Sequence, residues 1–235
     1  MIPVTDTCLP GLAQAEAARL FPADVAVAAA YPRDDAHDLM PEERDSLPNA
    51  VDRRIREFAA GRRAARLAMI DLGLPPRAVP AGRDRAPRWP RGTTGSISHT
   101  DRVCVAALAR ASQFRALGVD IEDDADLPAG VLPEICSPSE LAWLSIQPAA
   151  RRGRLARLIF SAKECAYKCQ YAISKALVGF DAFEITPDLE IGQFEATFTQ
   201  SVRGFGARSR LTGRFSLGQG VIVTAMTYPR AAAKS

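Results

Sequence analysis

Two segments far apart in the sequence place charged residues inside apolar runs, and this feature constrains the fold more than any other. Residues 118–122 read Gly-Val-Asp-Ile-Glu, and residues 160–168 read Phe-Ser-Ala-Lys-Glu-Cys-Ala-Tyr-Lys. In a strand, Asp120 and Glu122 share one face while the apolar residues beside them face the core. Two carboxylates this close repel each other unless a cation or a proton lies between them. The fold must therefore bring a partner to this strand, or else leave it as a solvated strand end.

The second segment lies in a stretch that predicts one long helix, at about residues 152–176. Glu164 and Lys168 are four residues apart, which is the spacing of an ordinary surface ion pair. The joint occurrence of three carboxylates with Lys163 and Lys168 favours another interpretation. Hard oxygen ligands beside ammonium groups are typical of a magnesium ion that holds a phosphate-bearing substrate.

A glycine followed by hydroxyl groups and a histidine supports the phosphate interpretation. Residues 95–100 read Gly-Ser-Ile-Ser-His-Thr and run into the predicted turn of a hairpin, with strands at 96–98 and 103–109. Hydroxyl groups and backbone amides in such a turn donate to phosphate oxygens. The alternative is a polar turn in which His99 caps a backbone carbonyl.

Composition restricts the class of protein. The 235 residues are 47% apolar and 24% charged, which indicates a globular chain with one large domain or two small ones. The longest uncharged apolar stretch, residues 25–31, is too short to span a membrane, and residues 1–6 do not resemble a signal peptide. We therefore expect a cytoplasmic protein. Five scattered cysteines and two histidines predict reduced thiols and make a zinc site a poor fit.

Periodicity predicts an α+β class with mostly antiparallel sheets. Residues 25–30 and 117–122 are predicted strands, and residues 51–72 form the clearest helix. A short helical stretch within residues 1–22 is expected to be a surface lead-in. Alternating apolar residues predict three or four further antiparallel strands, within residues 180–186, 194–198, 211–217 and 220–226.

Arg62 occupies a position on the apolar stripe of the predicted helix at 51–72. A guanidinium there needs a partner, because burying it unpaired is costly. It either extends to the surface along its aliphatic stem or meets a bound anion.

Arginines also crowd residues 53–66, 83–91 and 151–157. These are either solvated faces or contacts for phosphate or for an acidic partner protein.

With these motifs together, the chain resembles the 4'-phosphopantetheinyl transferases of the large monomeric class, in the enterobactin-type branch. The resemblance covers about residues 50–170. Within this range, residues 54–66 and 89–99 are the parts that resemble the enterobactin-type branch. It implies an α+β fold of two similar halves related by a pseudo-twofold axis. The N-terminal half, residues 1–115, would grip the nucleotide of coenzyme A. The C-terminal half, residues 116–235, would carry the metal ligands and the catalytic helix.

The resemblance also implies a reaction, the transfer of 4'-phosphopantetheine from coenzyme A to a serine of an apo acyl, peptidyl or aryl carrier protein. Such carriers serve siderophore, nonribosomal peptide, polyketide or fatty acid biosynthesis. Asp120, Glu122 and Glu164 would hold Mg²⁺, with Mn²⁺ as an alternative. Glu164 would accept the serine proton, directly or through a metal-bound water. Lys163 and Lys168 would neutralise charge on the phosphoryl oxygens.

By the same resemblance, the phosphates of coenzyme A would be held by Lys163, Arg54, Arg62, Ser98 and His99, and its adenine side would be approached by Arg85 and Arg88. Two residues depart from the usual motif. Phe160 stands where tryptophan is common, and Cys165 stands where a smaller residue is usual. We interpret both as packing changes, with Cys165 as a buried residue and not a reactive thiol.

Two other functions fit parts of the sequence. The arginine-rich helix at residues 53–66 is compatible with a nucleic-acid-binding protein, although no aromatic stacking platform accompanies it. The acidic trio alone is compatible with a metal-dependent phosphohydrolase. We expect no nucleic-acid partner and a monomer.

Overall fold

Two antiparallel sheets form the centre of the computed structural model, which describes residues 8–32 and 38–231. The three-stranded sheet has the order β1-β3-β2, and the five-stranded sheet has the order β4-β8-β7-β6-β5. All pairings are antiparallel, so the predicted α+β class is confirmed. The strands are β1 Val25–Ala30, β2 Thr93–His99, β3 Cys104–Arg110, β4 Phe114–Asp123, β5 Phe183–Asp188, β6 Gln193–Phe198, β7 Arg210–Gly218 and β8 Val221–Pro229.

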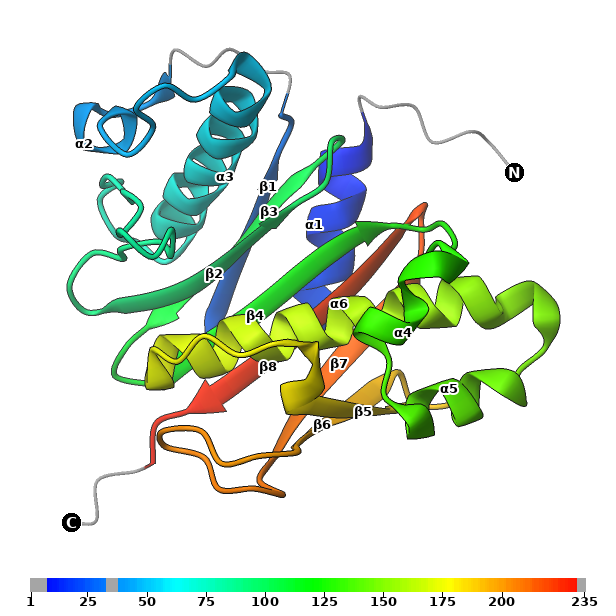
Figure 1. Ribbon diagram of the computed structural model, residues 1–235. Coiled ribbons are helices and arrows are strands. Elements are labelled where there is room, and N and C mark those ends of the chain that lie inside the picture. Colours follow the sequence, from blue (N-terminus) through cyan, green and yellow to red (C-terminus); the bar gives the residue numbers. More distant parts are fainter. Residues whose placement is uncertain (1–7, 33–37, 232–235) are drawn as a thin grey trace.

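The three-stranded sheet is covered on both faces (Figure 1). Helix α3 (Asp52–Asp71) packs on one face through an alanine-rich side, and the short side chains of β1 and β3 allow it to come close. Residues on the opposite face, such as Val27 and Val105, pack with β4, β8 and α1 (Leu9–Leu20). The helix predicted at residues 51–72 is confirmed, but Val51 precedes α3 and is 71% exposed.

Helix α1 contradicts the expectation of a surface lead-in. Its residues Leu9, Ala13 and Ala17 are fully buried. They recur every four residues and therefore form one narrow apolar face. This face packs against strands of both sheets, because its core cluster contains residues of β1, β3, β4 and β8. The helix thus closes the core between the two sheets.

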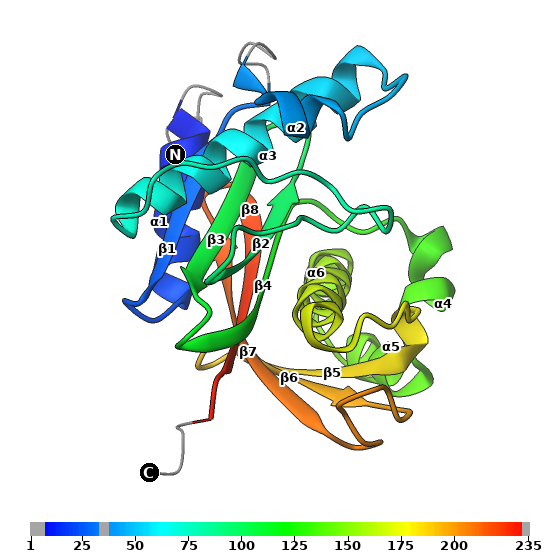
Figure 2. The same cartoon turned by 90° about the vertical axis from the view of Figure 1, so that its left-hand side faces the viewer.

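The five-stranded sheet curls around helix α6 (Ala149–Ser174), which Figure 2 shows nearly end-on. The helix buries apolar residues against strands β4 to β8, and α5 (Pro138–Ser145) packs beside it. Gly118 allows the closest approach, since a Cβ there would lie 2.3 Å from the carbonyl oxygen of Cys165. Strand β4 and α6 are therefore in direct contact next to the acidic segment. Cys165 is fully buried, as predicted.

The two sheets meet along β2 and β4, which lie side by side (Figure 2). These strands belong to different sheets and are joined by side chains. The Val119 amide donates to Ser96 Oγ at 3.0 Å, and Thr94 Oγ1 donates to the Arg115 carbonyl at 3.4 Å. Because β2 and β4 do not pair through backbone hydrogen bonds, polar side chains between these two strands can face a ligand.

Further predictions concern membrane-spanning segments, a signal peptide and the boundary between the two halves of the chain. Within residues 8–32 and 38–231, no helix is long and apolar enough to cross a membrane. The expectation about a signal peptide concerns residues 1–6, which lie outside the described residues. The proposed boundary between residues 115 and 116 falls near the start of β4, and the division into two similar halves stays a prediction.

Candidate active site

A pocket of about 330 Å³, here called the central pocket, lies where β2, β4, α3 and α6 meet. It contains every residue assigned to the site from the sequence except Lys163 and Arg88. Phe160, Pro87 and Ile97 complete its wall. The residues that line it with polar side chains are Arg54, Arg62, Arg85, Ser98, His99, Asp120, Glu122, Glu164 and Lys168. Segments up to 114 residues apart in the chain thus share one pocket, from Arg54 to Lys168.

Asp120 is the most unusual residue of the central pocket. Its Oδ1 accepts hydrogen bonds from Ser98 Oγ at 2.7 Å and from Lys168 Nζ at 2.6 Å. Its Oδ2 is buried and has no hydrogen-bond partner among the described residues. Buried polar atoms are nearly always paired, so an orphaned carboxylate oxygen needs an explanation. A cation bound beside Oδ2 would supply one.

Lys168 provides the positive charge nearest to Asp120. Its Nζ also donates to Ser98 Oγ at 2.9 Å and to the Val119 carbonyl at 3.2 Å. Burial lowers the pKa of Lys168, but the nearby charges of Asp120 and Glu164 outweigh it, and the pKa is raised. The lysine is therefore an ammonium. It bonds to Asp120, so the simple ion pair between Glu164 and Lys168 is not what the structure shows.

Glu122 and Glu164 face the same pocket as Asp120. Burial raises the pKa of Glu122 to about 7, and Asp120 adds to the effect, although Arg157 Nη1 donates to Glu122 Oε2 at 3.0 Å. Burial also raises the pKa of Glu164, and Lys168 offsets part of this shift. Within the described residues, no three His, Cys, Asp or Glu side chains are gathered as a ready metal site. The donor set nevertheless consists of hard oxygens, which suit Mg²⁺.

Arg54 and His99 form the other wall of the pocket. Arg54 Nη1 lies 3.2 Å from His99 Nε2. Burial lowers the pKa of His99, even though the Glu57 carboxylate opposes the shift. A neutral imidazole can accept from the guanidinium, which keeps Arg54 oriented toward the pocket. The alternative in which His99 caps a backbone carbonyl stays a prediction, because a backbone hydrogen bond with Thr100 also acts on the pKa of His99 and raises it.

Arg62 finds partners inside the protein. Its Nε donates to the Val79 carbonyl at 2.8 Å, and its guanidinium lies 3.6 Å from the centroid of the Phe58 ring. Burial lowers its pKa to about 10, so it remains charged at neutral pH. The residue is 6% exposed, which excludes the interpretation that its head extends into solvent. The charge is available to an anion in the central pocket.

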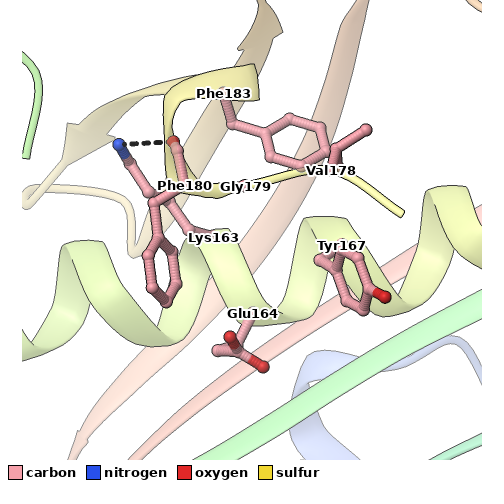
Figure 3. Close-up of a pocket in the computed structure, with 7 residues that line it drawn as sticks. All are labelled: Lys163, Glu164, Tyr167, Val178, Gly179, Phe180 and Phe183. Carbon is pink, nitrogen blue, oxygen red and sulfur yellow. Dashed lines mark hydrogen bonds between the residues drawn. The ribbon is translucent and has the colours of Figure 1, made fainter. Parts of the chain in front are cut away.

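Lys163 lies on the other side of α6. Figure 3 shows that Lys163 and Glu164 leave the helix in different directions. Lys163 Nζ is 2.8 Å from Glu140 Oε2 and donates to the carbonyls of Ile135 at 2.7 Å and Phe180 at 3.0 Å. The structure therefore does not bring Lys163 to the central pocket. Consecutive residues of a helix point about 100° apart. Because Glu164 faces the central pocket, the neighbouring Lys163 points away from it and is buried against Glu140.

The arginines at residues 151–157 were expected to be a solvated face or a docking surface. Arg151 and Arg152 are exposed, as a solvated face requires, but Arg154 Nη2 donates to Asp124 Oδ2 at 2.7 Å, and Arg157 pairs with Glu122 and the Asp126 carbonyl. Arg154 and Arg157 are therefore the members of this group that do not form a solvated face. They tie the chain after β4 to α6 and so fix the end of the acidic strand. Sequence reasoning missed the role of Arg157, because its partner is 35 residues away.

Two further pockets adjoin the central pocket. An apolar pocket of about 120 Å³ is lined by Lys163, Glu164, Tyr167 and residues of the segment 178–183 (Figure 3). An aromatic pocket of about 270 Å³ contains Trp89, Tyr167 and Tyr171. Glu164 borders both the central and the apolar pocket, and Lys168 borders both the central and the aromatic pocket. Groups bound in different pockets can therefore meet at this turn of α6.

Comparison with known protein families gives two matches along the chain. A model described as the 4'-phosphopantetheinyl transferase N-terminal domain matches residues 42–109. A model of the 4'-phosphopantetheinyl transferase superfamily matches residues 116–213. Together these matches contain every residue of the central pocket.

Curated relatives match over most of the chain. 4'-phosphopantetheinyl transferase Npt of Nocardia iowensis is 36% identical over 209 residues, which are 84% of this chain and 92% of that protein. 4'-phosphopantetheinyl transferase Svp of Streptomyces mobaraensis is 40% identical over 199 residues, which are 83% of this chain and 80% of that protein. Enterobactin synthase component D of Salmonella typhi is 37% identical over 155 residues, which are 64% and 62% of the two chains.

Proposed function

This chain belongs to the 4'-phosphopantetheinyl transferase superfamily, and we propose that its central pocket carries out Mg²⁺-dependent transfer of 4'-phosphopantetheine from coenzyme A to a serine of an apo carrier protein. The observation that carries the proposal is the unpartnered Oδ2 of Asp120 beside two carboxylates with raised pKa values. Arginines and a lysine surround this acidic group, as a diphosphate requires. One chain supplies every wall of the pocket, so we expect a monomer to be active.

Asp120, Glu122 and Glu164 would hold the metal ion. When bound, Mg²⁺ supplies positive charge to the diphosphate and polarises the phosphorus under attack. The chemistry of the oxygen donors accepts Mn²⁺ as well. Arg157 holds one oxygen of Glu122 at 3.0 Å, so it orients that carboxylate without occupying both of its oxygens.

The reaction forms one bond and breaks one. The serine oxygen attacks the phosphorus that carries pantetheine, and the bond from this phosphorus to the oxygen of adenosine 3',5'-bisphosphate breaks. Glu164 accepts the serine proton, because it is the carboxylate that borders both the central and the apolar pocket. Lys168 stabilises negative charge on the phosphoryl oxygens. Arg54 and Arg62 bind the nucleotide phosphates, with Ser98 and His99 between them and the acidic strand.

The carrier would approach from the apolar pocket. Glu164 forms part of its wall, so a serine entering there reaches the base directly. The name of the Salmonella relative leads us to propose a carrier of siderophore or other nonribosomal peptide synthesis. A nucleic-acid-binding function is not favoured, because much of the charge on α3 is paired within the chain: Arg53, at the surface, with Glu57 and Asp101, and Arg66, which is buried, with Glu43.

Intact-mass spectrometry of apo carrier proteins tests the proposal. Purified protein, coenzyme A and Mg²⁺ should add one 4'-phosphopantetheine mass to a carrier, and chelation with EDTA should stop the reaction until Mg²⁺ is restored. A carrier in which the acceptor serine is replaced by alanine is the control. If coenzyme A binds but no acyl, peptidyl or aryl carrier gains mass, the proposed transfer is wrong.

A further inference from the structure

A loop before β2, residues 79–89 and here called the strap, forms part of the wall of two pockets. Arg85 and Pro87 line both the central pocket and the aromatic pocket. The base of the strap is firmly attached to the N-terminal helices. The Val79 amide donates to Glu43 Oε1 at 2.9 Å, and the Val79 carbonyl accepts from Arg62. The strap therefore starts from a fixed point and extends across the site.

The tip of the strap is a tight turn with a strained residue. The Gly82 amide donates to the Ala86 carbonyl at 2.8 Å, and the Arg85 amide donates to the Gly82 carbonyl at 2.9 Å. Arg85 has φ 63°, a left-handed conformation that is unfavourable for a residue with a Cβ. Such strain persists only where the surroundings impose it, and it concentrates at ligand sites. Here it sends the Arg85 side chain to the boundary between two pockets.

A hydrogen bond joins this tip to α6. Tyr171 Oη donates to Asp84 Oδ2 at 2.6 Å, across 87 residues of sequence. Asp84 Oδ1 accepts from the Ala86 amide at 3.2 Å, so the same carboxylate braces the turn around Arg85. The glycine at residue 82 makes room for this arrangement, since a Cβ there would lie 2.3 Å from Asp84 Oδ1.

The Tyr171 hydroxyl is itself held in place. Its ring stacks with Tyr167 at a centroid distance of 5.8 Å, and Lys175 Nζ lies 5.2 Å from its centroid. Tyr167 borders the apolar pocket beside Glu164. The strap is thus attached at its base to α3 and at its tip to the helix that carries Glu164 and Lys168.

We propose that Tyr171 and Asp84 are positioning residues that hold Arg85 toward the phosphates of coenzyme A in the central pocket. The inference rests on the proposed function. It assigns the pair a role in nucleotide affinity and none in the chemical step, because neither group lines the central pocket. Loss of the hydrogen bond frees the tip and lets Arg85 leave the phosphates.

The variant Tyr171→Phe removes the hydroxyl and keeps the ring. We expect the Kd for adenosine 3',5'-bisphosphate, measured by isothermal titration calorimetry, to rise about fivefold, the effect of losing one hydrogen bond. The KM for coenzyme A should rise by the same factor, while kcat changes less than twofold. Tyr228→Phe is the matched control, since its ring packs against Phe205 away from the strap.

A double-mutant cycle with Arg85→Ala decides whether Tyr171 acts through the arginine. Arg85→Ala should raise the Kd, and adding Tyr171→Phe should raise it no further. The inference is overturned if either single variant keeps the wild-type Kd or if the two effects simply add. Failure of the wild-type protein to bind the bisphosphate and coenzyme A would instead contradict the proposed function.

Discussion

Helix α6 carries the fully buried Lys163 and the partly buried Lys168 on different sides, and the carboxylates that these lysines contact differ in their remaining hydrogen bonds. Lys163 lies 2.8 Å from Glu140, and Lys168 lies 2.6 Å from Asp120. Glu140 is saturated, because it also accepts from the amides of Ser137 and Ile185 at 2.7 Å. Asp120 keeps one buried oxygen that no described residue reaches.

This difference separates a structural ion pair from a binding site. A buried pair whose remaining acceptors are all satisfied joins elements, here α5, α6 and β5. A buried acidic cluster with unused oxygens and raised pKa values is incomplete without a ligand. A lysine next to a carboxylate is therefore not enough to identify a functional site. The hydrogen bonds of the carboxylate distinguish the two cases.

The largest effect is expected from neutralising the acidic side. Asp120→Asn and Glu164→Gln keep the shape and remove the charge, so transfer should fall by roughly 10³-fold or more because metal binding and proton removal are lost. Time courses of carrier mass at saturating coenzyme A measure the rate, and circular dichroism checks the fold. A variant that retains a tenth of the wild-type rate would show that its carboxylate is dispensable.

The second effect concerns the Lys163 side and should appear in stability. Lys163→Met leaves Glu140 buried without a cation, so the free energy of unfolding should fall by about 3–5 kcal/mol. Urea unfolding measures it, and transfer per folded molecule should stay within threefold of wild type. The double variant Lys163→Met/Glu140→Gln should recover much of the loss. A Lys163→Met protein that is stable but inactive would show that Lys163 takes part in the transfer reaction.

On the other side, Lys168→Met should reduce transfer by roughly 10²-fold, because a charge that faces the phosphoryl oxygens is removed. It also leaves Asp120 without its ammonium, so Mg²⁺ should stabilise this variant more than it stabilises the wild type. Thermal unfolding in EDTA and in Mg²⁺ measures the difference. Equal shifts in Tm for both proteins would mean that Lys168 and the metal do not share Asp120.

Among the central-pocket variants, the smallest effect on transfer is expected from replacing Ser98. Ser98→Ala removes the hydroxyl that lies between Lys168 and Asp120, so both stability and transfer should fall modestly, by about 1 kcal/mol and about fivefold. Ser161→Ala is the control, because this buried hydroxyl pairs with Thr224 Oγ1 at 2.9 Å and should affect stability alone. If the two variants lose the same activity, Ser98 has only a structural role.

Local patterns were sufficient for much of the fold. The alternation of residues 118–122 predicts two carboxylates on one face, and Val119 and Ile121 are indeed fully buried on the other. The hairpin of β2 and β3 and helices α3 and α6 also follow from periodicity and turn residues. Such features depend on neighbours within a few positions, which the sequence displays directly.

Features that depend on distant partners were not predictable in this way. The side of α6 that Lys163 takes is set by Glu140 and Phe180, and the place of α1 is set by strands from both sheets. The Tyr171–Asp84 contact joins residues 87 positions apart. No local pattern encodes which carboxylate each lysine of α6 contacts.

The amino-acid sequence alone therefore specifies the chemistry: three carboxylates, a lysine and a set of arginines at spacings that belong to a phosphopantetheinyl transferase. The packing of α6 against β4 and β5 decides the surroundings of these groups. It buries Lys163 against Glu140, whose oxygens also accept hydrogen bonds from backbone amides, and it leaves Asp120 Oδ2 without a hydrogen-bond partner among the described residues. The physical reason is that the cost of desolvating a charge depends on every atom around it, and those atoms come from the whole chain.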